Sequence, residues 1–447
     1  MLVGVRASVL CLVSESAYSA SSTERSMFWT VVLTAVGTAL LFTVGLNFVT
    51  AEKKLLRKVA HKHAVASEQF RREMGVMMGP MIVGGNRIID LHNGEQIFPA
   101  MLTAIAAAKH TITFETYIYW SGNIGRRFTD ALTERAVAGV QVKVLVDWVG
   151  TVKMESAMLE SMRDAGVEVH RYHPLKWYNI GRLNNRTHRK LLVTDGRVGF
   201  TGGVGVADHW DGSAQDPDHW RDMHFRVEGP VVAQLQAGFL DNWIKTTGEV
   251  LNGADYFPAL TRVGDTDAHL FLSSPTGGGE SMHLMYLMAI AAAERTIDLE
   301  ASYFVPDTLI IEALVGARHR GVAVRILLPG EHIDSDVVRL SSRRLWGELL
   351  LAGVEIYEYT PTMIHSKLLI VDHEMVSVGS TNFDIRSFQL NDEASLNLYD
   401  QPFAERMTDV FNRDVQPSRR YTHAMWKARP LAERFAETVL LPIRSQL

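Results

Sequence analysis

The chain has almost no cysteine and no excess of charge of either sign. Its single cysteine, Cys11, excludes an internal disulfide framework and a cysteine-rich zinc site. The 45 lysines and arginines are balanced by 50 aspartates and glutamates, so the net charge of −5 gives no general attraction to nucleic acid. A glycine-rich P-loop with its lysine is also missing, and the scattered histidines lack metal-ligand spacing. The sequence therefore predicts no metal, no cofactor and no nucleic acid partner.

Charge is also missing from residues 26–51. Residues 28–49, FWTVVLTAVGTALLFTVGLNFV, would span about 33 Å as a helix, which is enough for a bilayer core. We predict a leader of unclear status over residues 1–26 and a transmembrane helix over residues 27–50. The basic residues that follow place the rest of the chain in the cytoplasm. We expect residues 51–80 to form a basic juxtamembrane helix, which either fixes this topology or also lies on anionic lipid headgroups.

The rest of the chain repeats itself. Residues 104–119 (AIAAAKHTITFETYIY) match residues 289–304 (AIAAAERTIDLEASYF) at eight of sixteen positions, and three further segments match in the same order. Short β-branched runs alternate with helical stretches in each half, which predicts α/β lobes with helices on a mixed sheet. We place the first lobe at residues 81–262 and the second, with a C-terminal helix, at residues 263–447. About ten extra residues in the first half, near 175–184, form either a loop at the mouth of the site or a neutral insertion.

The last repeated segment contains a motif that is suited to phosphate chemistry. His188-x-Lys190-x4-Asp195 is followed by two glycines, and His365-x-Lys367-x4-Asp372 is followed by GSTN. Both motifs lie in apolar runs that predict strands, so each histidine shares a face with its lysine while each aspartate has the other parity. We therefore expect the aspartates to brace a turn. A hairpin at Asp195-Gly196 would bring the glycines beside the histidine.

These residue types fit the transfer of a phosphodiester. Two lysines supply positive charge to the phosphoryl oxygens. One histidine can attack phosphorus while the other protonates the departing oxygen and then serves as base for the incoming alcohol or water. We expect Gly203, Ser380 and Asn382 to line the phosphate pocket, because glycine lets a phosphate approach the backbone. The residues themselves do not decide which histidine attacks.

Both motifs resemble the HxKxxxxD(x)6G(G/S)xN signature of the phospholipase D superfamily. The resemblance runs from about residue 80 to the end and implies two lobes related by a pseudo-two-fold axis around one shared site. It also implies a phosphohistidine intermediate, in which family usage favours the first-half histidine as nucleophile, and an acidic residue downstream of each motif that orients its histidine. Glu393 matches that position in the second half and Asp222 is its counterpart in the first, although either could be a surface carboxylate. The first half departs from the signature at Gly205, where asparagine is usual.

The segments GGVGVADHW, WRDMHFRVEGPVV and ASYFVPD resemble bacterial cardiolipin synthases of the phospholipase D type. That resemblance implies transfer of a phosphatidyl group between two phosphatidylglycerol molecules, with release of glycerol. Together with the predicted span and its basic flank, it leads us to expect a single-pass protein of the bacterial inner membrane with cytoplasmic lobes. The C-terminal stretch MWKARPLAERFAETVLLPI is either a packing helix or an amphipathic helix on the membrane. A phospholipase D hydrolase remains open, whereas a superfamily nuclease and a non-enzymatic scaffold fit the sequence less well.

Overall fold

The computed structural model describes residues 22–45, 58–174, 185–274 and 281–440, and divides the chain into two compact units. In the smaller unit, α2 (Ser22–Gly45) is a single helix whose apolar side chains are exposed, including those of Met27, Leu33 and Phe42. Across the described stretches, none of the helices is both long enough and apolar enough to cross a membrane. The transmembrane helix predicted over residues 27–50 is thus not confirmed, and its last residues lie outside the described part. The predicted loop at 175–184 also lies outside it.

The predicted basic helix over residues 51–80 is present only in its last part, and residues 58–67 correct the prediction. Residues 58–67 are not helical, and α3 (Glu68–Met77) begins only after Ser67, whose hydroxyl accepts the backbone N–H of Phe70 at 3.2 Å. A serine N-cap of this kind starts a helix because it satisfies a free backbone donor. The preceding residues pack on the second half of the chain, where Lys58 forms an ion pair with Glu312 at 3.1 Å.

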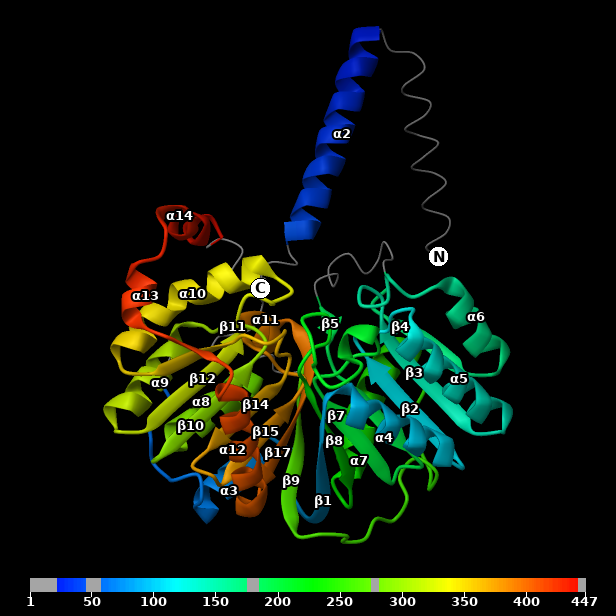
Figure 1. Cartoon of the computed structure of the whole chain (residues 1–447). Coiled ribbons are helices and arrows are strands. Elements are labelled where there is room, and N and C mark those ends of the chain that lie inside the picture. Colours follow the sequence, from blue (N-terminus) through cyan, green and yellow to red (C-terminus); the bar gives the residue numbers. More distant parts are fainter. Residues whose placement is uncertain (1–21, 46–57, 175–184, 275–280, 441–447) are drawn as a thin grey trace. The chain divides into compact units, whose positions relative to one another are not determined.

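After α3, the larger unit continues with the first half of the repeat (Figure 1). Its elements follow in the order β1 (Val83–His92), α4 (Asn93–Ala107), β2 (Thr111–Thr116), α5 (Asn123–Val137), β3 (Gln141–Asp147), α6 (Ser156–Asp164), β4 (Glu168–Tyr172), β5 (Arg186–Thr187), β6 (Leu191–Thr194), β7 (Val198–Gly202), β8 (Met223–Glu228) and α7 (Val232–Thr247). Alternation of strand and helix, followed by a run of strands, is the order that the hydrophobic pattern predicts.

The second half repeats that order. Its elements are β9 (Thr266–Ser273), α8 (Ser281–Ala292), β10 (Thr296–Ala301), β11 (Phe304–Val305), α9 (Thr308–His319), β12 (Ala323–Pro329), α10 (Asp336–Leu351), β13 (Glu355–Tyr359), β14 (Lys367–Val371), β15 (Met375–Gly379), β16 (Phe383–Asp384), α11 (Ile385–Gln389), β17 (Asn391–Tyr399) and α12 (Gln401–Val415). After α12 come β18 (Arg419–Tyr421), α13 (His423–Lys427) and α14 (Leu431–Val439). The predicted C-terminal helix is therefore two helices, because Pro430 has no backbone N–H with which to continue α13.

Most strands of both halves belong to one mixed sheet, in the order β18-β13-β12-β10-β14-β15-β17-β9-β1-β8-β7-β6-β2-β3-β4, with β5 paired to β17 off this path. The strands β11 and β16 form a separate two-stranded sheet. In each half the central strand pairs in parallel with one neighbour, as β2 does with β3, and antiparallel with the other, as β2 does with β6. The halves meet where β9 pairs antiparallel with β1. The predicted α/β architecture with a mixed sheet is confirmed, and the repeated order of elements agrees with a duplication.

Helices cover both faces of the sheet. The strands alternate between two cores, because successive side chains point to opposite faces. Leu192 packs with α4, α5 and α6, whereas its neighbours Leu191 and Val193 pack against α7. In the second half Leu369 packs with α8, α9 and α10, whereas Leu368 faces the core under α12. The helices α7 and α12 thus share one central core between the halves, which fixes one half against the other.

Candidate active site

The two motif histidines lie where the halves meet. His188 follows β5, a short strand that pairs in parallel with β17 of the other half, and its backbone N–H donates to the Asp392 carbonyl at 2.8 Å. The backbone N–H of His365 likewise donates to the Arg221 carbonyl of the first half at 2.7 Å. Both histidines stand just before a strand, not within one as the sequence predicts, because these backbone contacts reach across to the opposite half.

Each imidazole is held by a carboxylate of the other half. The Nδ1–H of His188 donates to Glu393 Oε2 at 2.9 Å, and the Nδ1–H of His365 donates to Asp222 Oδ2 at 2.8 Å. The two carboxylates were expected to orient the histidine of their own motif, and this pairing is wrong. The contact on Nδ1 fixes the tautomer of each imidazole and leaves Nε2 for chemistry.

Burial sets the ionisation of these groups. It lowers the pKa of His188 to about 4, against the opposing charge of Glu393. It lowers the pKa of His365 to about 3, and the charge of Lys367 adds to this effect. Burial alone would raise the pKa values of Glu393 and Asp222, but each of these pKa values is lowered by the histidine that the carboxylate contacts. At neutral pH the site therefore holds neutral imidazoles beside ionised carboxylates.

The motif lysines lie beside the histidines. Lys190 Nζ donates to the backbone oxygen of His188 at 2.8 Å. Lys367 Nζ donates to Ser302 Oγ at 2.6 Å and lies 3.2 Å from His365 Nε2. Burial lowers the pKa of Lys190 to about 7 and that of Lys367 to about 8. An anionic phosphoryl group would raise both pKa values and favour the charged lysines.

One cavity of about 470 Å³ contains both histidines. Its lining includes His188, Lys190, His365 and Asn382, so it combines the two motifs. Aromatic rings form much of the remaining wall, and the ring of Trp210 lies edge-on to His365 with 5.2 Å between the ring centroids. The arrangement can hold one phosphorus atom between two imidazoles.

The motif aspartates do not belong to this cavity. Asp195 lies at the turn after β6, where its carboxylate accepts the backbone N–H groups of Lys109, His110 and Thr111 at 2.7–3.1 Å. Asp372 accepts three equivalent N–H groups at the start of β10. These carboxylates anchor the turn to the neighbouring strand, so their role is in the fold and not in contact with substrate.

Two of the three predicted phosphate-pocket residues touch the orienting carboxylates instead. A Cβ on Gly203 would come within 2.2 Å of Asp222 Oδ1, so the glycine leaves room for the carboxylate and not for a phosphate. Ser380, at the matching place, donates its hydroxyl to Glu393 Oε2 at 2.6 Å. Asn382 does line the cavity. Its counterpart Gly205 has no space for an added side chain, since a Cβ there would lie 2.9 Å from the Cβ of Ile118 and 3.2 Å from the ring of Trp210.

Sequence reasoning missed several site residues. Glu115 and Glu300 occupy equivalent buried positions on β2 and β10, and each accepts a hydroxyl next to a motif histidine, Thr187 or Ser366, at 2.5 Å. The sequence contained evidence for them, because both glutamates occupy the same position of the first repeated segment. Trp210 donates its indole N–H to Asp222 at 2.9 Å and gave no signal, because its counterpart in the second half differs.

Comparison with known proteins agrees with this geometry. The duplicated mixed sheet with two histidine–lysine pairs is a phospholipase D-like fold, and a solved phosphatidylserine synthase from Haemophilus influenzae superposes with a TM-score of 0.61, at 12% identity over 85% of this chain and 100% of that one. A family model described as cardiolipin synthase, phospholipase D-like domain, matches residues 101–242 and 286–415. The chain belongs to this family.

Individual relatives support the same assignment. A cardiolipin synthase of Alkalihalophilus pseudofirmus is 35% identical over 389 residues, which cover 86% of this chain and 74% of the relative. The major cardiolipin synthase of Bacillus subtilis is 33% identical over 357 residues, which cover 79% of this chain and 74% of the relative.

Proposed function

We propose that the protein is a cardiolipin synthase that transfers a phosphatidyl group from one phosphatidylglycerol to another and releases glycerol. The observation that carries this proposal is the single cavity in which His188 and His365 are each held by a carboxylate of the opposite half. Membership of the cardiolipin synthase family supplies the substrate class. The exchange replaces one phosphodiester by another, so it requires no nucleotide.

His188 is the proposed nucleophile. Its Nε2 attacks the phosphorus of the donor, the bond to the glycerol oxygen breaks, and His365 gives its proton to that oxygen. The resemblance to the phospholipase D superfamily supports this division, because family usage favours the first-half histidine as nucleophile. The negative charge of the substrate raises the pKa of His365, which provides the proton.

The second half-reaction reverses these roles. The now neutral His365 removes the proton from the primary hydroxyl of the acceptor. The acceptor oxygen attacks phosphorus, the phosphorus–nitrogen bond breaks, and His188 returns to its starting state. Lys190 and Lys367 balance the charge on the phosphoryl oxygens in both steps, and Asn382 contributes a polar group from the cavity wall.

The cavity also suits an acceptor that carries its own phosphate. Three further cations line it, namely Lys153, Arg186 and Arg386, of which Arg186 lies 3.4 Å from Asp147. Burial raises the pKa of Asp384, an acidic residue of the same wall, to about 7, which weakens its negative charge. Water and neutral alcohols carry no negative charge that could pair with these cations, whereas an acceptor phosphatidylglycerol carries an anionic phosphodiester that can. This favours the synthase over a hydrolase.

The finer assignments belong to the same proposal. The two lobes comprise residues 81–262 and 263–447, and the protein acts at the inner membrane of a bacterium with its lobes in the cytoplasm. The exposed apolar side chains of α2 and the uncharged run over residues 27–50 favour an N-terminal anchor.

The test is to incubate the full-length protein with labelled phosphatidylglycerol and identify the products. Cardiolipin and glycerol in equal amounts support the synthase, whereas phosphatidic acid as the main product overturns it in favour of a hydrolase. His188→Ala and His365→Ala should each abolish turnover, and acid-labile label trapped on histidine should be lost in His188→Ala.

A further inference from the structure

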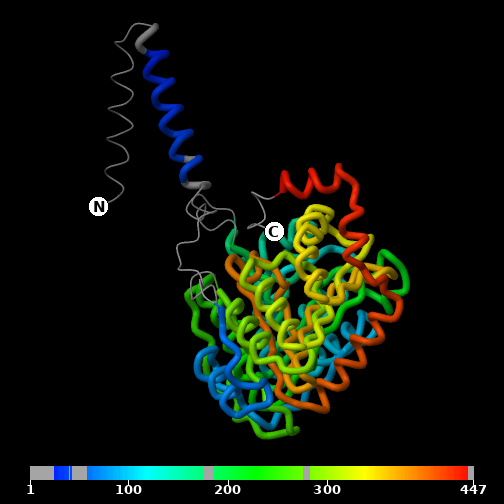
Figure 2. Tube along the Cα trace, turned by 90° about the vertical axis from the view of Figure 1, so that its left-hand side faces the viewer, coloured from blue at the N-terminus to red at the C-terminus, as the bar shows by residue number. Residues whose placement is uncertain are grey.

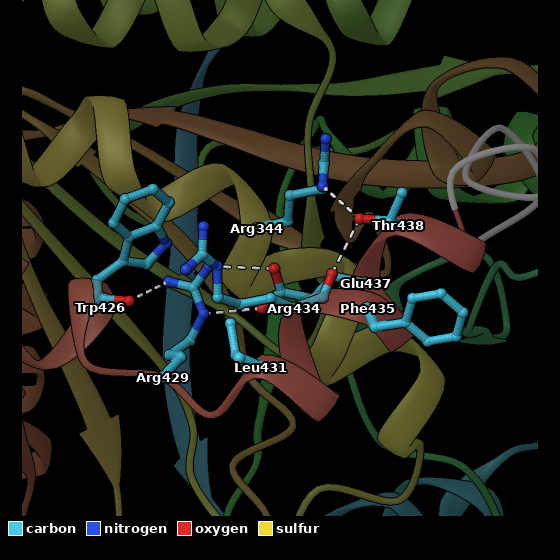
Figure 3. Close-up of a pocket in the computed structure, with 8 residues that line it drawn as sticks. All are labelled: Arg344, Trp426, Arg429, Leu431, Arg434, Phe435, Glu437 and Thr438. Carbon is cyan, nitrogen blue, oxygen red and sulfur yellow. Dashed lines mark hydrogen bonds and ion pairs between the residues drawn. The ribbon is translucent and has the colours of Figure 1, made fainter.

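A second cavity, of about 460 Å³, lies on the second half of the chain between α10, α13 and α14 (Figure 3). Three arginines line it, Arg344, Arg429 and Arg434. Arg429 is buried and is bound to Glu437 of α14, with 2.9 Å between Nε and Oε1 and 3.1 Å between Nη2 and Oε2. This ion pair fixes α14 to the chain that follows α13. The other two arginines are exposed and form no ion pair with the residues that the structure describes.

Helix α14 presents an apolar stripe beside this cavity. Leu431, Phe435 and Val439 are 78%, 72% and 59% exposed, and their spacing of four residues places them along one side of the helix. Figure 3 shows the Phe435 ring turned away from the Arg429–Glu437 pair. A row of large apolar side chains on a helix held in place by a buried ion pair indicates a surface that binds something apolar.

The cavity is connected to the catalytic site by one helix. The N-terminal end of α10 lines the catalytic cavity through Ser335 and Val338, and Arg344 of the same helix lines the arginine cavity. Arg344 lies nine positions after Ser335, the N-cap of α10, which corresponds to a rise of about 14 Å. Figures 1 and 2 both show α14 against α10. Whatever binds α14 therefore lies close to the catalytic cavity.

We propose that α14 and the arginine cavity dock on a bilayer of anionic phospholipid. Arg344 and Arg434 bind the phosphodiester of a lipid that is not being turned over, and the apolar stripe enters the boundary between headgroups and acyl chains. Charge complementarity selects this partner, because both acidic residues within α14 are already paired, Glu433 with Arg343 at 3.0 Å and Glu437 with Arg429. Guanidinium groups match a phosphodiester, and a helix with one apolar face lies in the plane of the interface. The inference rests on the proposed action on membrane lipid.

The test uses an environment-sensitive dye on the full-length protein. In a Cys11→Ser background, the dye is attached through Val439→Cys or, as a control, through Val137→Cys on α5, where valine is 74% exposed. The protein is titrated with vesicles of phosphatidylcholine alone or mixed with phosphatidylglycerol. We expect a blue shift at position 439 with the anionic vesicles and none at position 137. A dye at position 439 that keeps its emission in water would overturn the proposal.

The arginines are tested in the same assay. Arg344→Ala combined with Arg434→Ala should raise the amount of anionic lipid needed for the shift roughly thirtyfold, from the usual attraction of two surface arginines to an anionic leaflet. Arg126→Ala with Arg127→Ala, two exposed arginines of α5, should leave it unchanged. An equal titration for the two double variants refutes the arginine site. Because the dye reports docking without turnover, loss of docking with intact transfer between short-chain soluble phosphatidylglycerols separates this inference from the proposed function.

Discussion

Replacement of Asp222 by asparagine tests the crossed pairing of histidines and carboxylates. Asp222 accepts three hydrogen bonds, from His365 Nδ1 at 2.8 Å, Trp210 Nε1 at 2.9 Å and the Met223 backbone at 2.7 Å. Asparagine keeps the shape but removes the charge that stabilises a protonated His365. A hydrogen bond to a charged group contributes about 1.5–3 kcal/mol, so we expect the rate of transfer to fall roughly 10- to 150-fold.

A donor whose leaving group needs no proton separates an effect on His365 from an effect on His188. A donor whose leaving group is p-nitrophenol needs no proton from His365, because this phenol departs as its anion. In Asp222→Asn the initial burst of p-nitrophenol should therefore stay near the wild-type rate, while release of glycerol from phosphatidylglycerol is slow. Glu393→Gln, which disturbs the nucleophile His188, should slow both.

Asp216→Asn is the matched control, because Asp216 also contacts a histidine, His219 at 2.6 Å, but does not line the catalytic cavity. It should leave both rates unchanged. The reasoning would be refuted if Asp222→Asn slowed the burst as much as the release of glycerol, since Asp222 would then serve the nucleophile.

Three further predictions concern residues that hold the active site and the surrounding fold in place. Gly203→Ala should abolish transfer, because its Cβ would lie 2.2 Å from the carboxylate of Asp222, whereas Gly316→Ala, with nothing within 4 Å, should retain normal activity in the same assay. Asp372→Asn should lower the melting temperature by weakening three hydrogen bonds to backbone N–H groups, a loss of roughly 1–3 kcal/mol, while kcat per folded molecule is kept. Burial raises the pKa of Glu115 to about 7, so the stability of the folded protein should fall as the pH rises from about 4.5 through 7. Glu115→Gln should reduce the dependence of the melting temperature on pH in this range. An unchanged dependence would contradict the raised pKa of Glu115.

The sequence by itself determined the chemistry and the layers of the fold. Two copies of a histidine–lysine pair at equivalent places of a repeat can be read directly from the chain, because a duplication preserves spacing. The placement of Asp195 at a turn follows from the Asp195-Gly196 hairpin signal at the end of the apolar run. The alternation of β-branched runs with helical stretches was sufficient to predict an α/β fold with a mixed sheet.

Only the tertiary structure decided which residues meet. Asp222 contacts the histidine of the second half and Glu393 that of the first, and this crossed pairing depends on how β9 pairs with β1 and on the core shared by α7 and α12. No periodicity within one half of the sequence encodes how the halves pack. The role of Gly203 also became clear only from the structure, because Asp222, just before the adjacent strand β8 of the same half, places its carboxylate where a Cβ would lie. Spacing along the chain fixes local geometry, whereas contacts across the interface are set by the packing of the two halves.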